Sequence, residues 1–133
     1  MTEPWSTRPS WCYGTPGIAR AVQLAAIAVG DVDRQRSAEQ AIAACLTDPQ
    51  PLTEPGLCHG LAGLYQTAFR AAADATSPAI AAQLPPLTDR LTRAATRHTT
   101  ERHRGRRVDQ ASPVPRILAA VCRFDRLASV FVL

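Results

Sequence analysis

Two cysteines and one histidine in this sequence have the types and spacing of a metal site. Cys12 and Cys58 stand 46 residues apart, and His59 directly follows Cys58. Thiolate sulfur and imidazole nitrogen are common zinc ligands, and a set of three leaves the fourth position of a tetrahedral ion open, as a catalytic site requires. The spacing alone also fits a second interpretation, in which the two cysteines are unrelated thiols of a hydrophobic core.

An internal repeat connects the two cysteines. The pattern C-x-G-x-x-G begins at Cys12 and again at Cys58, and an Ala-rich apolar segment follows each copy, over residues 18–29 and 61–73. A repeat of this length predicts two stacked helical hairpins. Both cysteines would then lie close together at helix starts, where the partial positive charge of a helix N-terminus favours the thiolate form.

The first hairpin is predicted from its breakers and its apolar pattern. A helix over residues 15–29 has a proline in its first turn and ends before Gly30. This helix is apolar nearly all round, so we expect it to be buried on most sides. Asp31 or Asp33 caps a second helix over residues 34–46. The second helix carries one apolar stripe, and its polar residues lie opposite: Arg34, Gln35, Glu39 and Gln40.

The second hairpin repeats this arrangement. A mostly apolar helix is predicted from Leu61 to Asp74, and Ser77-Pro78 starts a fourth segment. Pro85-Pro86 interrupts that segment, which resumes as a helix from Leu87 to about His103. The predicted order of the four helices is therefore inner, outer, inner, outer.

The composition favours helices and excludes several classes of protein. Apolar residues make up 46% of the 133 residues but aromatic residues only 5%, which favours closely packed Ala-rich helices over a β-sandwich. No apolar run is long enough for a transmembrane helix, and the N-terminus lacks the pattern of a signal peptide. We therefore expect a cytoplasmic protein whose cysteines are thiols or metal ligands. Cys45 and Cys122 are expected in the core.

Positive charge is concentrated near the C-terminus. Residues 1–89 carry five Arg and eight acidic residues, a net charge of −3, whereas residues 90–133 carry ten Arg and three acidic residues, a net charge of +7. Phosphate contacts of a nucleic acid would need such a patch, formed by Arg90, Arg93, Arg97, Arg102, Arg104, Arg106 and Arg107. No aromatic residues lie among them, so a solvated helix face is the preferred interpretation and nucleic acid is not an expected partner.

Two short motifs surround the cysteines. Residues 11–17 read Trp-Cys-Tyr-Gly-Thr-Pro-Gly, and residues 56–63 read Gly-Leu-Cys-His-Gly-Leu-Ala-Gly. These motifs resemble the W-C-x-G-x-P-G and C-H-G zinc motifs of the lanthionine synthetase C-like family, the lanthipeptide cyclases. The resemblance covers about residues 5–95. It implies an all-α fold of αα-hairpin repeats that form part of an (α/α) toroid, incomplete here. It also implies Zn²⁺ held by Cys12, Cys58 and His59.

The resemblance implies the closure of thioether rings as the activity. In the family, zinc binds a cysteine of the substrate peptide and lowers its pKa, the thiolate adds to dehydroalanine or dehydrobutyrine, and the resulting enolate is protonated. The implied partner is a dehydrated lanthipeptide precursor. A dehydratase, or an upstream half of the toroid, is a further implied partner.

Two more site residues are carried over from the family pattern. Arg8 stands four residues before Cys12, where the family's cyclases place an Arg of the active site, and it would stabilise the enolate oxygen. Tyr13 follows Cys12 and would line the site. The alternatives are an exposed loop residue for Arg8 and packing beside the inner helices for Tyr13.

The chain departs from the family pattern in length and in one catalytic residue. The family's proton-donating His lies upstream of the W-C-x-G motif and has no matching position here, and His98 and His103 are expected on the surface. The family's closing G-x-x-G repeat has no counterpart in the tail. We therefore expect a partial toroid over residues 1–104 and a divergent basic tail over residues 105–133. A non-catalytic, zinc-stapled peptide-binding module or an inactive remnant is the alternative to a cyclase.

Two hairpins cannot close a toroid, which has a consequence for stability. One side of each repeat stack stays open, and terminal repeats then need polar caps or partners. We expect residues 18–29 and 61–73 to expose apolar surface in an isolated monomer. The sequence therefore predicts marginal stability, self-association or dependence on a partner.

Overall fold

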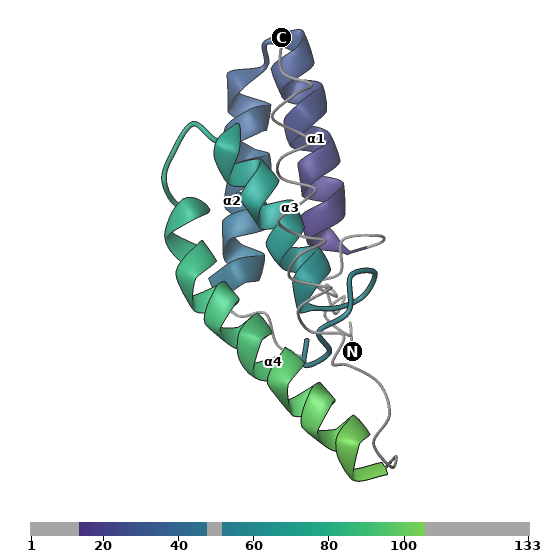
Figure 1. Ribbon diagram of the computed structural model, residues 1–133. Helices are drawn as coiled ribbons and strands as arrows, with labels where there is room; N and C mark the ends of the chain where they lie inside the picture. Colours follow the sequence, from purple (N-terminus) through teal and green to yellow (C-terminus); the bar gives the residue numbers. More distant parts are fainter. Residues whose placement is uncertain (1–13, 48–51, 106–133) are drawn as a thin grey trace, which may run out of the picture.

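The computed structural model describes residues 14–47 and 52–105, with side chains described up to residue 100. These residues form four α-helices and one short 3₁₀ segment: α1 (Thr15–Val29), α2 (Val32–Thr47), α3 (Leu61–Ala73), η1 (Ala81–Gln83) and α4 (Leu84–Gly105). In Figure 1, α1 and α2 lie side by side, α3 crosses this pair, and α4 runs along the outer edge of α3. The described residues contain no strand, so the predicted all-α class is confirmed.

The turn between α1 and α2 follows the prediction closely. Gly30 adopts a left-handed conformation with φ of 72°, which glycine reaches without a steric penalty, and α1 ends there. Of the two predicted caps for α2, the structure uses Asp31, because its Oδ1 accepts a hydrogen bond from the backbone N–H of Arg34 at 3.0 Å. The helix α2 consequently begins two residues earlier than predicted.

The second hairpin differs from its prediction at one junction. The helix α3 ends at Ala73, one residue before the predicted end, and Asp74 is its C-cap. Residues 78–80 form a turn and η1 follows, after which α4 begins at Leu84 rather than Leu87. Pro85-Pro86 therefore lies inside the first turn of α4. Backbone N–H groups in a first turn have no intrahelical partner, so the missing N–H of each proline costs no hydrogen bond there.

The hydrophobic core lies around α3. Its buried members come from all four helices and from Ile80 before η1: Ala19, Ile42, Leu46, Leu61, Leu64, Ala68, Ala71, Ile80, Leu87 and Ala94. Four of the ten belong to α3, which packs against the first hairpin on one side and α4 on the other. The prediction that residues 61–73 expose apolar surface is therefore wrong for most of α3.

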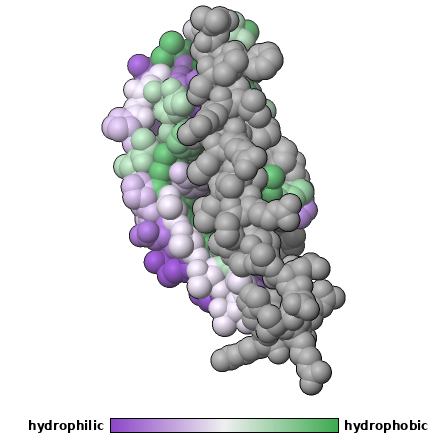
Figure 2. Space-filling view, in the orientation of Figure 1, coloured by the Kyte–Doolittle hydropathy of each residue, from purple (hydrophilic) through white to green (hydrophobic). Residues whose placement is uncertain are grey.

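The helix α1 is more exposed than its composition predicts. Ile18 is 61% exposed and Val29 is 77% exposed, and other large apolar residues of this helix are exposed as well: Val22, Leu24 and Ile27. The expectation of a helix buried on most sides is wrong for α1, because α2 and α3 are the elements of the described residues that pack substantially against it. The expected exposure of apolar surface over residues 18–29 is confirmed. Apolar residues also reach the surface at the top of Figure 2, where Figure 1 places the turn between α1 and α2.

None of the described helices is both long enough and apolar enough to cross a membrane.

Candidate metal centre

The loop before α3 folds back onto the first turn of that helix. The N–H of Leu61 donates to the carbonyl of Glu54 at 2.8 Å, and the N–H of Gly63 donates to the carbonyl of Gly56 at 3.5 Å. The first N–H groups of a helix need partners from outside the helix. Here the loop backbone supplies them in place of a side chain, since the N-cap residue is Gly60. These bonds fix the loop relative to α3.

Cys58 and His59 lie on the turn at the end of this loop. Both side chains are exposed, and they precede the N-cap Gly60 by two residues and one residue. A thiol and an imidazole are donors that suit zinc. Because the loop is hydrogen-bonded to α3, a defined backbone carries these two side chains at the surface.

The two copies of the repeat have equivalent glycines at their helix starts. Gly14 is the N-cap of α1 with φ of −100° and ψ of 174°, and Gly60 is the N-cap of α3 with φ of −130° and ψ of −172°. Both glycines are buried and extended. The predicted equivalence of the two helix starts is confirmed by this match.

The other predicted site residues lie outside the described part of the chain. These are Arg8, Cys12 and Tyr13. Within the described residues, no group of three or more His, Cys, Asp or Glu side chains could hold a metal ion. The assignment of Cys12, Cys58 and His59 as one ligand set therefore stays a prediction.

The sequence carries the signature of a known family over most of its length. The family model described as lanthionine synthetase C-like protein matches residues 2–112. The chain belongs to the lanthionine synthetase C-like family. Neither the curated proteins nor the solved structures that were compared with the chain gave a match. This match extends beyond both ends of residues 5–95, the span that the motifs predict.

Gly60, the third residue of the family's C-H-G motif, has no room for a side chain. A Cβ atom at this position would lie 2.5 Å from both the N and the O of Gly56, and close to the carbonyl oxygen of Glu54 as well. Real Cβ atoms essentially never approach other heavy atoms to less than 3.0 Å. The glycine is therefore required by the close approach of the loop backbone that carries Cys58 and His59.

We expect Gly60→Ala to displace this loop and to lower the free energy of unfolding by about 1–3 kcal/mol, the usual cost of an overpacked site. Gly56→Ala is a matched control in the same loop, because a Cβ at Gly56 meets nothing within 4 Å. Urea unfolding followed by circular dichroism measures both variants. Equal stabilities of the two variants would contradict the steric role of Gly60.

A third cysteine lies on α2, outside both family motifs in the sequence. Cys45 is half-buried, and its thiol forms a hydrogen bond with Thr15 at the start of α1. Burial raises the pKa of the Cys45 thiol, and this hydrogen bond offsets only part of the rise. A neutral, packed thiol agrees with the prediction that Cys45 is part of the interior rather than a ligand.

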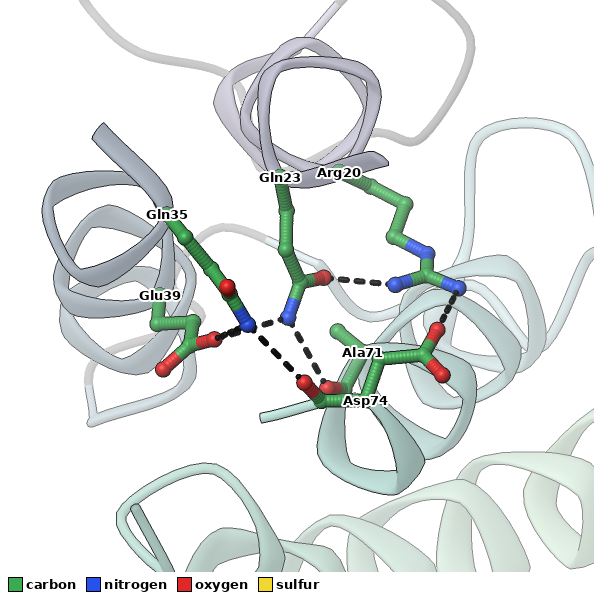
Figure 3. A network of polar contacts seen from close by, with 6 residues as sticks. All are labelled: Arg20, Gln23, Gln35, Glu39, Ala71 and Asp74. Carbon is green, nitrogen blue, oxygen red and sulfur yellow. Dashed lines mark hydrogen bonds and ion pairs between the residues drawn. The ribbon is translucent and has the colours of Figure 1, made fainter. Parts of the chain in front are cut away.

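The largest polar network of the described residues was not predicted from the sequence. Its centre is Glu39 of α2, which is only 4% exposed (Figure 3). One carboxylate oxygen, Oε1, accepts hydrogen bonds from Gln23 of α1 at 3.2 Å and from Gln35 at 2.9 Å. The other, Oε2, accepts from the backbone N–H and the hydroxyl of Thr76, at 3.0 and 2.7 Å.

The network extends from Glu39 to the end of α3. The amide nitrogens of the two glutamines also donate to the backbone carbonyls of Ala71 and Asp74, at 3.1 and 3.0 Å. Arg20 donates to the side-chain oxygen of Gln23 and forms an ion pair with Asp74 at 2.6 Å. These bonds connect the first hairpin to the second. Each carboxylate oxygen of Glu39 accepts two hydrogen bonds.

The placement of Gln35 and Glu39 corrects the prediction of a fully polar outer face on α2. Both residues are buried, because this edge of α2 faces α1 and the end of α3. One signal in the sequence could have indicated this. Gln23 is the one uncharged polar side chain between Ile18 and Val29, and it is 0% exposed. A buried amide needs hydrogen-bond partners from neighbouring elements.

A pocket of about 360 Å³ opens beside this network, between α2 and residues 76–79. Glu39 lines it, but both carboxylate oxygens of Glu39 already accept hydrogen bonds from the protein. The hydrogen bonds of Glu39 thus serve the packing of the two hairpins.

Proposed function

We propose that this chain is a zinc-binding protein related to the cyclases that add peptide cysteine thiols to dehydroalanine or dehydrobutyrine. The observation that carries the proposal is the exposed Cys58-His59 pair on a loop fixed by backbone hydrogen bonds, within a chain of the lanthionine synthetase C-like family. Cys12, at the equivalent position of the first repeat, completes the proposed ligand set. We further propose that residues 1–104 form a partial toroid and that residues 105–133 form a divergent tail. The proposed compartment is the cytoplasm.

The donor set is consistent with this proposal. Two thiolates and one imidazole suit zinc and leave one position for a substrate thiol. When bound there, zinc would lower the pKa of that thiol. Cys58 and His59 would hold the ion beside the N-terminus of α3, whose partial positive charge favours nearby anions. We place Arg8 and Tyr13 near the same site, where the cation of Arg8 would stabilise a developing enolate oxygen.

The proposed reaction balances without an oxidant or a reductant. The substrate thiol loses its proton, its sulfur forms a bond to the β-carbon of the dehydrated residue, and the α-carbon takes up one proton. The mass of the peptide does not change, whereas one thiol disappears. The substrate class is therefore a dehydrated precursor peptide that contains both a cysteine and a dehydro residue.

Zinc content tests the proposal. We expect about one zinc ion per chain in the purified protein, measured by mass spectrometry of the metal, and its loss in Cys58→Ser and His59→Ala. Cys45→Ser is the matched control, because Cys45 is a half-buried thiol of α2 and should leave the zinc content unchanged. A folded protein without zinc, or full zinc content in Cys58→Ser, would overturn the proposed site.

Activity separates the cyclase from its alternative. The protein, with and without an added upstream half of a family toroid, is incubated with a dehydrated peptide, and the remaining thiols are alkylated. A peptide that keeps the mass of the dehydrated precursor and no longer takes up the alkylating reagent supports a cyclase. Bound zinc with no loss of thiol in either mixture supports the alternative, a zinc-stapled module that binds peptides.

A further inference from the structure

The 46-residue repeat relates an exposed face of α1 to a buried face of α3. The offset gives two corresponding sets of residues: Ile18, Val22 and Ala25, here named the α1 stripe, and Leu64, Ala68 and Ala71, here named the α3 stripe. All three residues of the α3 stripe are 0% exposed. In the α1 stripe, Ile18 is 61% and Val22 is 37% exposed, and Ala25 is exposed too.

The first hairpin covers one side of the α3 stripe. The stripe belongs to one buried cluster with residues of the first hairpin, Ala19, Ile42 and Leu46, and with three residues that follow α3, Ile80, Leu87 and Ala94. The carbonyl of Ala71, in this stripe, also accepts a hydrogen bond from Gln23 of α1 at 3.1 Å. The structure thus shows how a hairpin of this chain covers the stripe of the hairpin that follows it.

The same offset identifies the surface that could cover the α1 stripe. Three buried residues of α1 correspond to three residues of α3: Ala19 to Tyr65, Gln23 to Phe69, and Ala26 to Ala72. Of the three on α1, Ala19 and Gln23 join the second hairpin, through the buried cluster and through a hydrogen bond to Ala71. These three residues of α3, here named the far face, are only half-buried. The rings of Tyr65 and Phe69 stack with centroids 6.2 Å apart. The second hairpin therefore presents an apolar surface where a third hairpin would pack.

We propose that a second copy of this chain packs its α1 stripe onto the far face of the first copy, head to tail. The contact would continue the packing that joins the two hairpins within one chain. Both surfaces are apolar and uncharged, and Arg20, the one charged residue of α1, is turned to Asp74. The two surfaces differ, so the interface is heterologous and can add further copies. The proposal does not depend on zinc or on cyclase activity.

Sedimentation of the full chain between about 1 and 100 μM, the range for weak specific complexes, tests the proposal. We expect the mean mass to rise with concentration. Val22→Asp should weaken association at least about tenfold, because it places an unpaired charge in the interface. Leu24→Asp is the matched control. Leu24 is 48% exposed but lies about 200° around α1 from Val22, and its variant should associate like the original protein.

Mixing distinguishes a head-to-tail contact from a symmetric one. Phe69→Asp alters the far face, so each of Val22→Asp and Phe69→Asp alone should stay monomeric, with folding checked by circular dichroism. An equal mixture should form a dimer, because one intact stripe then meets one intact far face. A monomeric original protein at the highest concentration would overturn the proposal. So would self-association of folded Phe69→Asp, a monomeric mixture, or a loss of association in Leu24→Asp.

Discussion

Leu64→Ala should lower the free energy of unfolding by about 3 kcal/mol, whereas Ile18→Ala should change it by less than about 0.5 kcal/mol. The two residues occupy the same position in the 46-residue repeat. Leu64 is 0% exposed and Ile18 is 61% exposed, so only the first substitution leaves a cavity in a packed core. A Leu→Ala cavity costs both the lost transfer free energy and the lost contacts around it.

Urea unfolding of dilute protein, followed by circular dichroism, measures this pair of variants. Dilution matters because association of the folded chain would add a concentration-dependent term to the apparent stability. Leu57→Ala is a second control, since Leu57 is 60% exposed on the loop before α3. Comparable losses in Leu64→Ala and Ile18→Ala would mean that α1 is as well covered as α3, contrary to the structure.

The boundaries of the helices were largely predictable because they depend on local chemistry. Gly30 ends α1 through its left-handed φ, and the carboxylate of Asp31 starts α2 through a hydrogen bond to its first turn. Both effects involve neighbouring residues only, so the sequence contains them. The start of α4 was predicted three residues too late, and this error also arises from local chemistry. A pair of prolines ends a helix in its interior but is accepted in a first turn.

Burial was less predictable, because it depends on which elements meet. The apolar helices α1 and α3 have similar patterns, yet α1 packs against α2 and α3 whereas α3 packs against the whole first hairpin and against η1 and α4 as well. Composition alone could not distinguish Ile18 from Leu64. In the same way, Gln35 and Glu39 fit the pattern of a solvated helix face, and only the approach of Gln23 and Thr76 makes their burial possible.

The candidate site was recognised from its motifs rather than from its pattern of polarity. The C-H-G motif indicated Cys58 and His59, and the structure adds why a glycine must follow them, since the carbonyls of Glu54 and Gly56 approach Gly60 closely. That approach arises from a loop folding back on its own helix. No periodicity in the sequence encodes such a contact, so the role of Gly60 required the structure.

Glu39→Ala should lower the free energy of unfolding by about 2–4 kcal/mol. The substitution removes the acceptor shared by Gln23, Gln35 and Thr76, and it leaves the buried amides of the two glutamines without that partner. Glu54→Ala is the matched control, because the Glu54 side chain is exposed and should cost less than about 0.5 kcal/mol. Equal effects of the two substitutions in urea unfolding would show that the network contributes nothing to joining the hairpins.

The charge of Glu39 gives the network a dependence on pH. Burial by itself would raise the pKa of this carboxyl, but hydrogen bonds from Thr76, Gln23 and Gln35 together outweigh burial and hold the pKa below its ordinary value of 4.5. A carboxyl with a lowered pKa stabilises the folded state above the unfolded pKa. Its contribution should therefore be present above about pH 4.5 and disappear as the pH falls through the lower, folded pKa.

Glu39→Gln isolates this contribution from that of the other carboxyls. The amide keeps the size of the side chain, but in either orientation its NH₂ group meets a donor, the N–H of Thr76 or the amide nitrogens of Gln23 and Gln35, as the proton of a neutral carboxyl would. The free energy of unfolding of the original protein should exceed that of this variant by about 1–2 kcal/mol near neutral pH. This difference in stability should shrink on acidification below pH 4.5. The remaining carboxyls are common to both proteins and largely cancel. A difference that stays constant with pH would mean that the shape of Glu39, and not its charge, joins the two hairpins.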